Sequence, residues 1–241
     1  MPGERPWAVF LDFDGTLTGI AARPDGVRVD PGLPPLLARL RDALDGALAL
    51  VSGRAIATLD ELIGVAGLCV AGLHGLEWRL PRGETARYTP APGALDRARR
   101  GLTRFVAGDP RLLLEDKGLT LALHYRAAPE RRAACAERIA AEAARLEGYH
   151  VIEGKRVFEL KPAVANKGTA IRAMMANPDF AGRLPVFAGD DMTDEDGFAA
   201  VQDLGGFGVK VGDGETAAIY RVDDVAALVG WLEALECRIS T

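Results

Sequence analysis

The 241-residue sequence predicts an α/β fold, in which a doubly wound, mostly parallel β-sheet carries a smaller, inserted α+β domain. Short apolar runs without polar alternation recur along the chain, as is typical of strands that are covered on both faces. Helix-like segments separate these runs, and this alternation predicts helices on both sides of a parallel sheet. The middle of the chain breaks the alternation and indicates the inserted domain.

The elements of the sheet domain follow in order from these patterns. Strands are expected at the apolar runs 8–13, 47–53, 68–75, 184–190 and 207–214. Helices are expected over residues 34–46, 54–64 and 166–178. We expect this core domain in two parts of the chain, 1–88 and 162–241.

The inserted α+β domain is expected over residues 89–161. It should contain two amphipathic helices with basic outer faces, at residues 92–108 and 129–148. A strand is expected at 119–126 and a hairpin at 149–162. The turn of the hairpin is expected at Glu153 and Gly154.

The composition limits the classes of function. A hydrophobic content of 49% supports a large core, and a net charge of -5 argues against non-specific binding to nucleic acid or to an anionic membrane. The cysteines Cys69, Cys135 and Cys237 form no disulfide or zinc pattern, which favours a reducing compartment. No signal peptide or run of about 20 apolar residues is recognised, so we expect a cytoplasmic protein, and we favour a monomer.

Two carboxylates directly follow the first predicted strand, in the segment Asp12-Phe13-Asp14-Gly15-Thr16. In a regular strand, Asp12 and Asp14 would share one face, and two acids are costly on a dry face. The strand should therefore end here and open onto a solvated crevice, with Gly15 allowing the turn. A phosphoryl-transfer centre fits this pattern, and an ordinary turn with a helix cap is the alternative.

Two further motifs follow predicted strands. Ser52-Gly53-Arg54 comes directly after a strand, where a hydroxyl can donate to a phosphate, although a plain Ser N-cap would look the same. In Asn166-Lys167-Gly168, the lysine lies in the first turn of a helix, against the helix dipole. Its position makes sense if it neutralises a phosphate or carboxylates, and the alternative is a solvated surface lysine.

The fourth motif is the acid-rich segment 189–198, GDDMTDEDGF, after the strand ending at residue 188. Some of its acids must be helix caps. Asp190 and Asp191 directly follow the strand, however, and like charges there would repel one another unless a cation is present. Mg²⁺ with oxygen ligands is the simplest cation for this position. All four motifs fall at the carboxyl ends of core strands, where open α/β sheets bind ligands.

In the order DFDGT, SGR, NKG and GDD, these motifs resemble the haloacid dehalogenase superfamily of phosphatases over the whole chain. The sheet domain would then be its Rossmann-like core, and the insertion would be its cap. The segments HGLEW, LALHYR, VFELKPAVANKGTAI and FAGDDMTDEDGF resemble, more narrowly, the trehalose 6-phosphate phosphatase family.

The resemblance implies a mechanism. Asp12 would be the nucleophile that forms an aspartyl-phosphate, and Asp14 would be the general acid and then the general base. Ser52 and Lys167 would hold the phosphoryl oxygens. Mg²⁺ would be bound by the Asp12 side chain, the Asp14 backbone carbonyl and Asp190, with Asp191 as the alternative to Asp190.

Substrate-binding residues are also expected from the resemblance. A sugar phosphate presents many hydroxyl groups, which call for converging acids, amides and bases. The candidates are Arg54, His74, Glu77 and Asn166 in the core and Lys117, His124, Arg126, Glu159 and Lys161 in the cap. Each cap residue is as compatible with a solvated strand face as with a ligand-binding one.

The motifs disfavour three rival functions. A phosphate-accepting signalling domain has no use for an inserted cap, and a non-catalytic sensor needs no Asp nucleophile. The stretch 211–217, VGDGETA, suggests a dinucleotide site, but its acids would repel a pyrophosphate, so we interpret it as a turn and a helix start. Trehalose 6-phosphate is the leading substrate, ahead of sucrose 6-phosphate and glucosyl- or mannosyl-glycerate phosphates.

Overall fold

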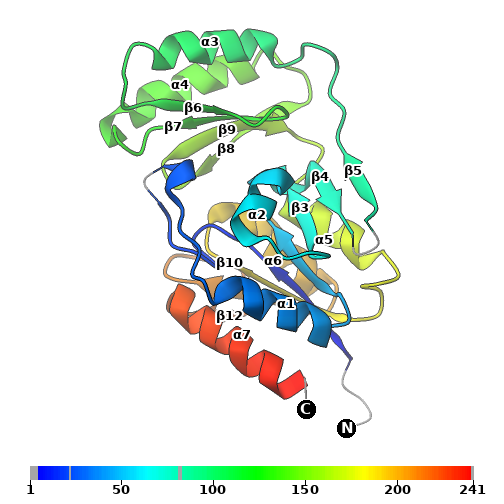
Figure 1. The fold of residues 1–241 in the computed structure, drawn as a ribbon. Coiled ribbons are helices and arrows are strands. Elements are labelled where there is room, and N and C mark those ends of the chain that lie inside the picture. Colours follow the sequence, from blue (N-terminus) through cyan, green and yellow to red (C-terminus); the bar gives the residue numbers. More distant parts are fainter. Residues whose placement is uncertain (1–4, 22, 81–82, 240–241) are drawn as a thin grey trace. The chain divides into compact units, whose positions relative to one another are not determined.

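A computed structural model describes residues 5–21, 23–80 and 83–239 of the chain. The chain folds into two compact units (Figure 1). Unit 1 contains the described residues of 1–21, 25–87 and 166–241, and unit 2 contains residues 23–24 and 88–165. Each unit has its own sheet and its own apolar core.

Unit 1 is built on an eight-stranded sheet with the strand order β12-β11-β10-β1-β2-β3-β4-β5. Neighbouring strands are parallel from β12 to β3, and the pairs β3–β4 and β4–β5 are antiparallel. The strands are β1 (Trp7–Leu11), β2 (Leu48–Val51), β3 (Cys69–Gly72), β4 (Glu77–Arg79), β5 (Thr85–Arg87), β10 (Leu184–Gly189), β11 (Phe207–Val211) and β12 (Tyr220–Val222).

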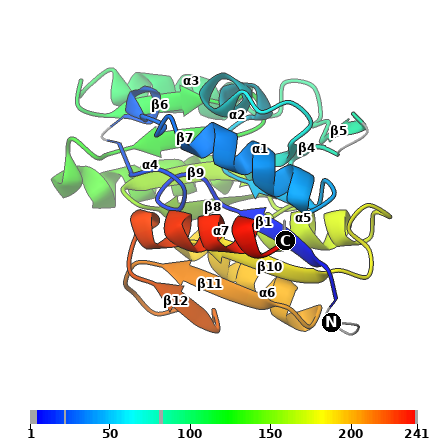
Figure 2. The ribbon, with the colours of Figure 1, turned by 60° about the horizontal axis from the view of Figure 1, so that its bottom comes forward.

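Helices cover both faces of this sheet, so the alternate residues of β1 enter two separate cores. Val9 and Leu11 pack with α1, α2 and α7, whereas Ala8 and Phe10 pack with α5 and α6. Figure 2 shows α1 and α7 side by side on one face. The helices of unit 1 are α1 (Leu33–Ala43), α2 (Ile56–Ile63), α5 (Lys167–Met175), α6 (Glu195–Asp203) and α7 (Val225–Ile239), with single turns η1 (Pro24–Gly26), η2 (Leu73–Gly75) and η4 (Met192–Asp194).

Unit 2 is a four-stranded antiparallel sheet, in the order β6-β7-β9-β8, with helices on one face. Leu121, Leu123, Phe158 and Leu160 point to that face and pack with residues of both helices. Its elements are β6 (Leu113–Asp116), β7 (Leu121–His124), β8 (Tyr149–Gly154), β9 (Val157–Pro162), α3 (Asp96–Val106), α4 (Arg132–Ala143) and η3 (Pro129–Arg131). Because side chains alternate along a strand, Glu115, His124, Glu159 and Lys161 occupy the opposite face.

The predicted fold class is confirmed, since the central sheet is mostly parallel and a separate antiparallel sheet is inserted into its chain. Two local predictions were wrong. The hairpin turns at Lys155 and Arg156, because Gly154 still pairs with Val157 and Arg156 takes the left-handed conformation with φ of 61°. The stretch 211–217 begins no helix but leads to the edge strand β12. Within the described residues, no helix is both long and apolar enough to span a membrane.

Candidate active site

The loop that follows β1 brings two carboxylates to the end of the central strand of unit 1. Asp12 is buried, and the chain then turns tightly, with the amide of Gly15 donating to the carbonyl of Thr18 (2.7 Å). Gly15 has φ of 87°, and a Cβ atom there would lie 2.1 Å from Oδ2 of Asp190. Glycine is therefore required for the turn and for the close approach of Asp190.

Asp12 belongs to a cluster of three buried aspartates around one buried lysine. Nζ of Lys167, the first residue of α5, lies 2.6 Å from Oδ1 of Asp12 and 2.6 Å from Oδ1 of Asp194. One carboxylate oxygen each from Asp12, Asp190 and Asp194 lies within 4.8 Å of the other two. Two of the three acids, Asp12 and Asp194, thus bind the ammonium group of Lys167, and Asp190 lies beside them.

Burial and like charge control the protonation of this cluster. The pKa of Asp12 is well above its usual value because burial and the nearby carboxylates of Asp194 and Asp190 outweigh the favourable charge of Lys167. Burial alone would lower the pKa of Lys167, but Asp12 and Asp194 raise it, so the lysine stays charged. The cluster has an excess of carboxylate oxygens, the donor set that suits a hard divalent cation such as Mg²⁺.

The two adjacent acids after β10 have different roles in the structure. The Asp190 carboxylate joins the cluster, whereas the Asp191 carboxylate accepts from the amide of Met192 (2.6 Å) as the N-cap of η4. Asp194 fixes this arrangement, because its Oδ2 accepts from the amides of Asp190 (2.9 Å) and Asp191 (2.8 Å). The geometry therefore favours Asp190 over Asp191 as a metal-binding candidate.

Thr16 and Lys210 also contact the acid cluster. The hydroxyl oxygen of Thr16 lies 3.2 Å from Oδ2 of Asp12 and 3.2 Å from Oδ1 of Asp190, so it connects the ends of β1 and β10. Lys210, a buried residue of β11, donates from Nζ to the backbone carbonyl of Asp190 (2.8 Å). Both contacts restrict the position of the Asp190 backbone and side chain.

Ser52 and Arg54 lie in the loop after β2, the neighbour of β1 in the sheet. Ser52 is buried, and its Oγ accepts from the amide of Arg54 (3.2 Å). Accepting this bond leaves the hydroxyl hydrogen of Ser52 able to donate. The Arg54 side chain forms an ion pair with Asp14, with Nε 2.6 Å from Oδ2.

Two other core candidates lie beside this loop. His74 is buried with φ of 57°, its amide donates to the carbonyl of Ser52 (2.9 Å), and its ring packs closely on Gly53. Glu77 has a structural contact, since its Oε1 accepts from the amide of Ile56 at the start of α2 (2.7 Å).

Asn166 is the N-cap of α5. Its Oδ1 accepts from the amide of Thr169 (2.7 Å), and Oγ1 of Thr169 accepts in return from the amide of Asn166 (2.9 Å). This capping box fixes the first turn of the helix, and so the position of Lys167.

The candidates in unit 2 form ion pairs and hydrogen bonds around the polar face of its sheet. Nε2 of His124 lies 2.8 Å from Oε2 of Glu115, and Nζ of Lys117 lies 3.2 Å from Oε2 of Glu159. The buried Lys161 donates to the carbonyl of Ala165. Arg126 follows His124 by two residues and donates from Nε to the carbonyl of Lys155 (3.3 Å).

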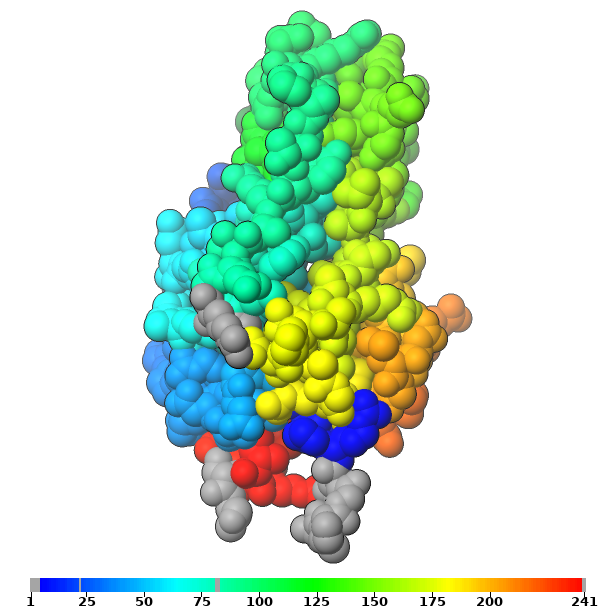
Figure 3. Space-filling view, turned by 90° about the vertical axis from the view of Figure 1, so that its right-hand side faces the viewer, coloured from blue at the N-terminus to red at the C-terminus, as the bar shows by residue number. Residues whose placement is uncertain are grey.

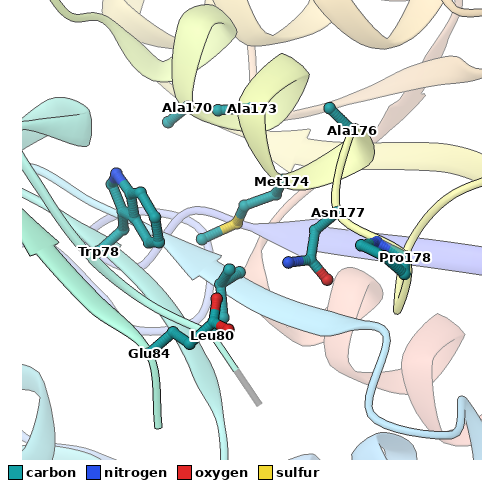
Figure 4. A pocket seen from close by; sticks show the side chains of 9 residues that line it. All are labelled: Trp78, Leu80, Glu84, Ala170, Ala173, Met174, Ala176, Asn177 and Pro178. Atoms are coloured by element: carbon teal, nitrogen blue, oxygen red, sulfur yellow. The ribbon is translucent and has the colours of Figure 1, made fainter. Parts of the chain in front are cut away.

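A cavity of about 280 Å³ in unit 1 involves none of these residues. It lies between β4 and the last turns of α5, and Figure 4 shows Met174 pointing into it toward Trp78. Figure 3 shows the surface of unit 1 on which the segment containing α5, in yellow, lies beside the segment of β4 and β5. The cavity is mostly apolar and is separate from the acid cluster.

Four residues that contact the acid cluster or the predicted candidates were not themselves predicted. Asp194 and Lys210 contact Asp190, Thr16 contacts two acids of the cluster, and Glu115 pairs with His124. Asp194 was visible only as one acid among five in the segment 189–198, and its spacing of four residues from Asp190 was the available signal. Lys210 lies within an otherwise apolar strand, and this position was a signal for a second missed residue, because a buried lysine needs a polar partner.

The chain is similar to known phosphatases over most of its length. A model of the trehalose-phosphatase family matches residues 10–226. The trehalose-6-phosphate phosphatase of Escherichia coli (strain K12) is 42% identical over 233 residues, which make up 95% of this chain and 86% of that protein.

Solved structures share the fold. The C-terminal domain of the trehalose-6-phosphate phosphatase of C. albicans has a TM-score of 0.85 at 22% identity and covers 97% of this chain and 93% of its own. A phosphatase of the haloalkanoate (HAD) superfamily from Bacteroides thetaiotaomicron has a TM-score of 0.62 at 18% identity and covers 97% of this chain and 95% of its own. These two structures show the likeness in fold. The expected resemblance to the trehalose 6-phosphate phosphatase family is confirmed, and the chain, a phosphoric monoester hydrolase, belongs to the trehalose-phosphatase family.

Proposed function

We propose that the protein is a Mg²⁺-dependent phosphatase that hydrolyses trehalose 6-phosphate to trehalose and phosphate through an aspartyl-phosphate intermediate. The observation that carries this proposal is the buried Asp12 carboxylate, held by Lys167 at the end of β1 and joined there by Asp190 and Asp194. The family match supports phosphate ester hydrolysis, and the name of the 42% identical relative supports trehalose 6-phosphate as the substrate.

In the first step, a carboxylate oxygen of Asp12 attacks phosphorus as the bond from phosphorus to the sugar oxygen breaks. The Asp14 carboxyl gives its proton to that oxygen, and trehalose leaves as a neutral alcohol. Lys167 and the Ser52 hydroxyl stabilise the negative charge on the phosphoryl oxygens. The position of Ser52, after the strand next to β1, supports this role.

In the second step, water attacks the phosphorus of the aspartyl-phosphate. The Asp14 carboxylate takes the proton of the water, and the bond from phosphorus to the Asp12 oxygen breaks. This step releases phosphate and restores the Asp12 carboxylate and the protonated Asp14. Asp14 is partly exposed, with 35% of its side chain accessible, which allows proton exchange with solvent.

Asp12, Asp190 and the backbone carbonyl of Asp14 would hold Mg²⁺. The fit rests on the donor set. Three buried carboxylates have oxygens within 4.8 Å of one another, and Lys167 binds two of them, those of Asp12 and Asp194. When bound, Mg²⁺ supplies positive charge that neutralises the transferring phosphoryl group. Asp194 binds Lys167 and two backbone amides, so we assign it to positioning.

We assign sugar recognition to the polar sheet face of unit 2. Glu159, Lys161 and His124 share that face, and Lys117 pairs with Glu159. These acids and bases can donate to and accept from the hydroxyl groups of a disaccharide. Arg126, His74 and Asn166 remain the further candidates. The proposed location is the cytoplasm, and Cys69, Cys135 and Cys237 are all free thiols.

The test is phosphate release from trehalose 6-phosphate, with and without Mg²⁺, beside sucrose 6-phosphate and a glucosyl-glycerate phosphate. Mg²⁺-dependent release with a strong preference for the trehalose ester is expected. Equal release across the panel would leave the phosphatase in place and contradict the substrate assignment. No release from any ester would favour a sugar-phosphate sensor.

A further inference from the structure

Arg54 and Asp14 form a two-point ion pair, which joins the loop after β2 to the loop after β1. Nε of Arg54 lies 2.6 Å from Oδ2 of Asp14, and Nη2 lies 2.8 Å from Oδ1. The arginine side chain is 12% exposed and the aspartate side chain 35%. A fork-to-fork pair of this kind fixes the plane of the carboxylate as well as its distance.

Arg54 is itself held in place from three directions. Its amide donates to Oγ of Ser52 (3.2 Å), and its carbonyl accepts from the amide of Leu73 (2.9 Å). Its guanidinium lies over the ring of Phe13, with Cζ 5.6 Å from the ring centroid. The guanidinium therefore presents a fixed surface to Asp14, whereas an unpaired aspartate at this exposure would sample several rotamers.

We infer that Arg54 is a positioning residue that acts through Asp14 and not through the transferred phosphoryl group. This inference rests on the proposed role of Asp14 as the general acid and base. The guanidinium uses one acceptor position on each carboxylate oxygen, and each oxygen retains a second position for the leaving oxygen or the attacking water. Because the carboxyl is already held in one orientation, the proton transfer does not have to pay the entropic cost of fixing its rotamer.

The inference predicts that the effect of Arg54 depends on the leaving group. Trehalose leaves as an alkoxide that needs a proton, whereas p-nitrophenolate is weakly basic and leaves without one. The first step can be observed alone in a single turnover with enzyme in excess, where the burst of alcohol or phenolate release does not depend on the later hydrolysis of the aspartyl-phosphate. In Arg54→Met, the burst rate with trehalose 6-phosphate should fall on the order of 100-fold, the usual contribution of general acid catalysis. The burst rate with p-nitrophenyl phosphate should change less than about threefold.

Asp14→Asn is the reference for this experiment, and it should show the same dependence on the leaving group. The double variant Arg54→Met/Asp14→Asn should be no slower with trehalose 6-phosphate than Asp14→Asn alone, because both changes remove one function. Arg54→Lys keeps the positive charge but cannot make the two-point pair. Its burst rate with trehalose 6-phosphate should therefore fall in part, and its burst rate with p-nitrophenyl phosphate should stay the same.

Arg79→Met is the matched control. Arg79 makes a similar two-point pair with Asp60, at 2.8 Å and 2.8 Å, on the outer side of α2. Its loss should leave the burst rates of both substrates unchanged. If Arg54→Met is too unstable to purify, Arg54→Lys carries the same comparison of substrates.

Each contrary result has its own meaning. Equal losses with both substrates, or a change in KM alone, would show that Arg54 binds the phosphoryl group and would overturn the inference. Additive losses in the double variant would also overturn it. If Asp14→Asn lost activity without regard to the leaving group, the proposed role of Asp14 would fail, and the inference would fail with it.

Discussion

Lys167 and Asp12 are 155 residues apart in the sequence, and Nζ of the lysine lies 2.6 Å from Oδ1 of the aspartate. The same Nζ is bound to Asp194, so one ammonium group neutralises two buried carboxylates. Lys167→Met would leave both acids buried without their cation. We expect it to lower the free energy of unfolding by about 3–5 kcal/mol and to abolish phosphate release.

Denaturant unfolding and phosphate release measure these two effects. Arg172→Met is the control on the same helix, because it removes an exposed ion pair with Asp203 that contributes at most about 1 kcal/mol. A Lys167→Met protein as stable as the wild type would contradict the inferred charge balance of the cluster.

Asp12→Asn is expected to abolish turnover and to leave the fold intact. The amide has no nucleophilic carboxylate oxygen, but its Oδ1 can still accept from Lys167. Mass spectrometry of acid-quenched wild-type enzyme with substrate should find one added phosphoryl group, and the variant should show none. Near-wild-type phosphate release by Asp12→Asn would refute the nucleophile assignment.

Asp190 and Asp191 form a matched pair for testing the metal site. Asp190→Asn removes a carboxylate of the cluster and should raise the Mg²⁺ concentration for half-maximal activity at least tenfold, roughly the effect of losing one ligand contact. Asp191→Asn should leave that concentration unchanged, because asparagine caps a helix as well as aspartate does. Equal effects of the two variants would contradict the choice of Asp190.

Removal of the metal should affect stability as well as activity. Chelator should abolish phosphate release, and added Mg²⁺ should restore it. A ligand that binds only the folded protein stabilises it by about 2.7 kcal/mol at a hundred times its Kd. Thermal unfolding should therefore shift upward with Mg²⁺ in the wild type, and less in Asp190→Asn. Turnover that resists the chelator would count against the metal.

The pair of Glu115 and His124 predicts a pH dependence in unit 2. Burial alone would raise the pKa of Glu115, but the hydrogen bond with His124 and the charge of Lys117 lower it below the usual 4.5. The folded protein thus binds fewer protons than the unfolded chain in this range. The stabilising contribution is present above the unfolded pKa and is lost as the pH falls through the folded one.

His124→Leu removes the main hydrogen bond to Glu115, because leucine has no side-chain donor, so the pKa of that carboxyl should rise. Carbon NMR of the glutamate side chain measures this pKa directly, and urea unfolding from pH 3 to 6 measures its effect on stability. An unchanged pKa in the variant would mean that Lys117 alone lowers it.

The sequence was most informative where a residue type conflicted with its surroundings. Asp12 and Asp190 follow buried strands, and Lys167 opposes a helix dipole, so each indicated a special site. The contacts of Asp194 could not be predicted in this way. They depend on the single turn η4, which folds Asp194 back toward the amide of Asp190.

Other features were hidden for different physical reasons. The ion pair between Arg54 and Asp14 depends on two loops that follow adjacent strands, and sequence spacing does not indicate which loop side chains meet. The short strands β4, β5 and β12 have three residues each, too few for a period-two pattern to be recognised. The shifted hairpin turn at Arg156 required a left-handed non-glycine residue, which turn preferences disfavour.

The sheet order also has a consequence for the order of folding. Strand β1 pairs with β10, so that Trp7 lies beside Leu184. All residues of unit 2 lie between these two strands in the sequence. Closing so long a loop costs more entropy than closing the shorter loops between the strands of unit 2. A chain leaving the ribosome has no complete acid cluster until Asp194 has been synthesised, so enzymatic activity during refolding reports that β1 and β10 have paired.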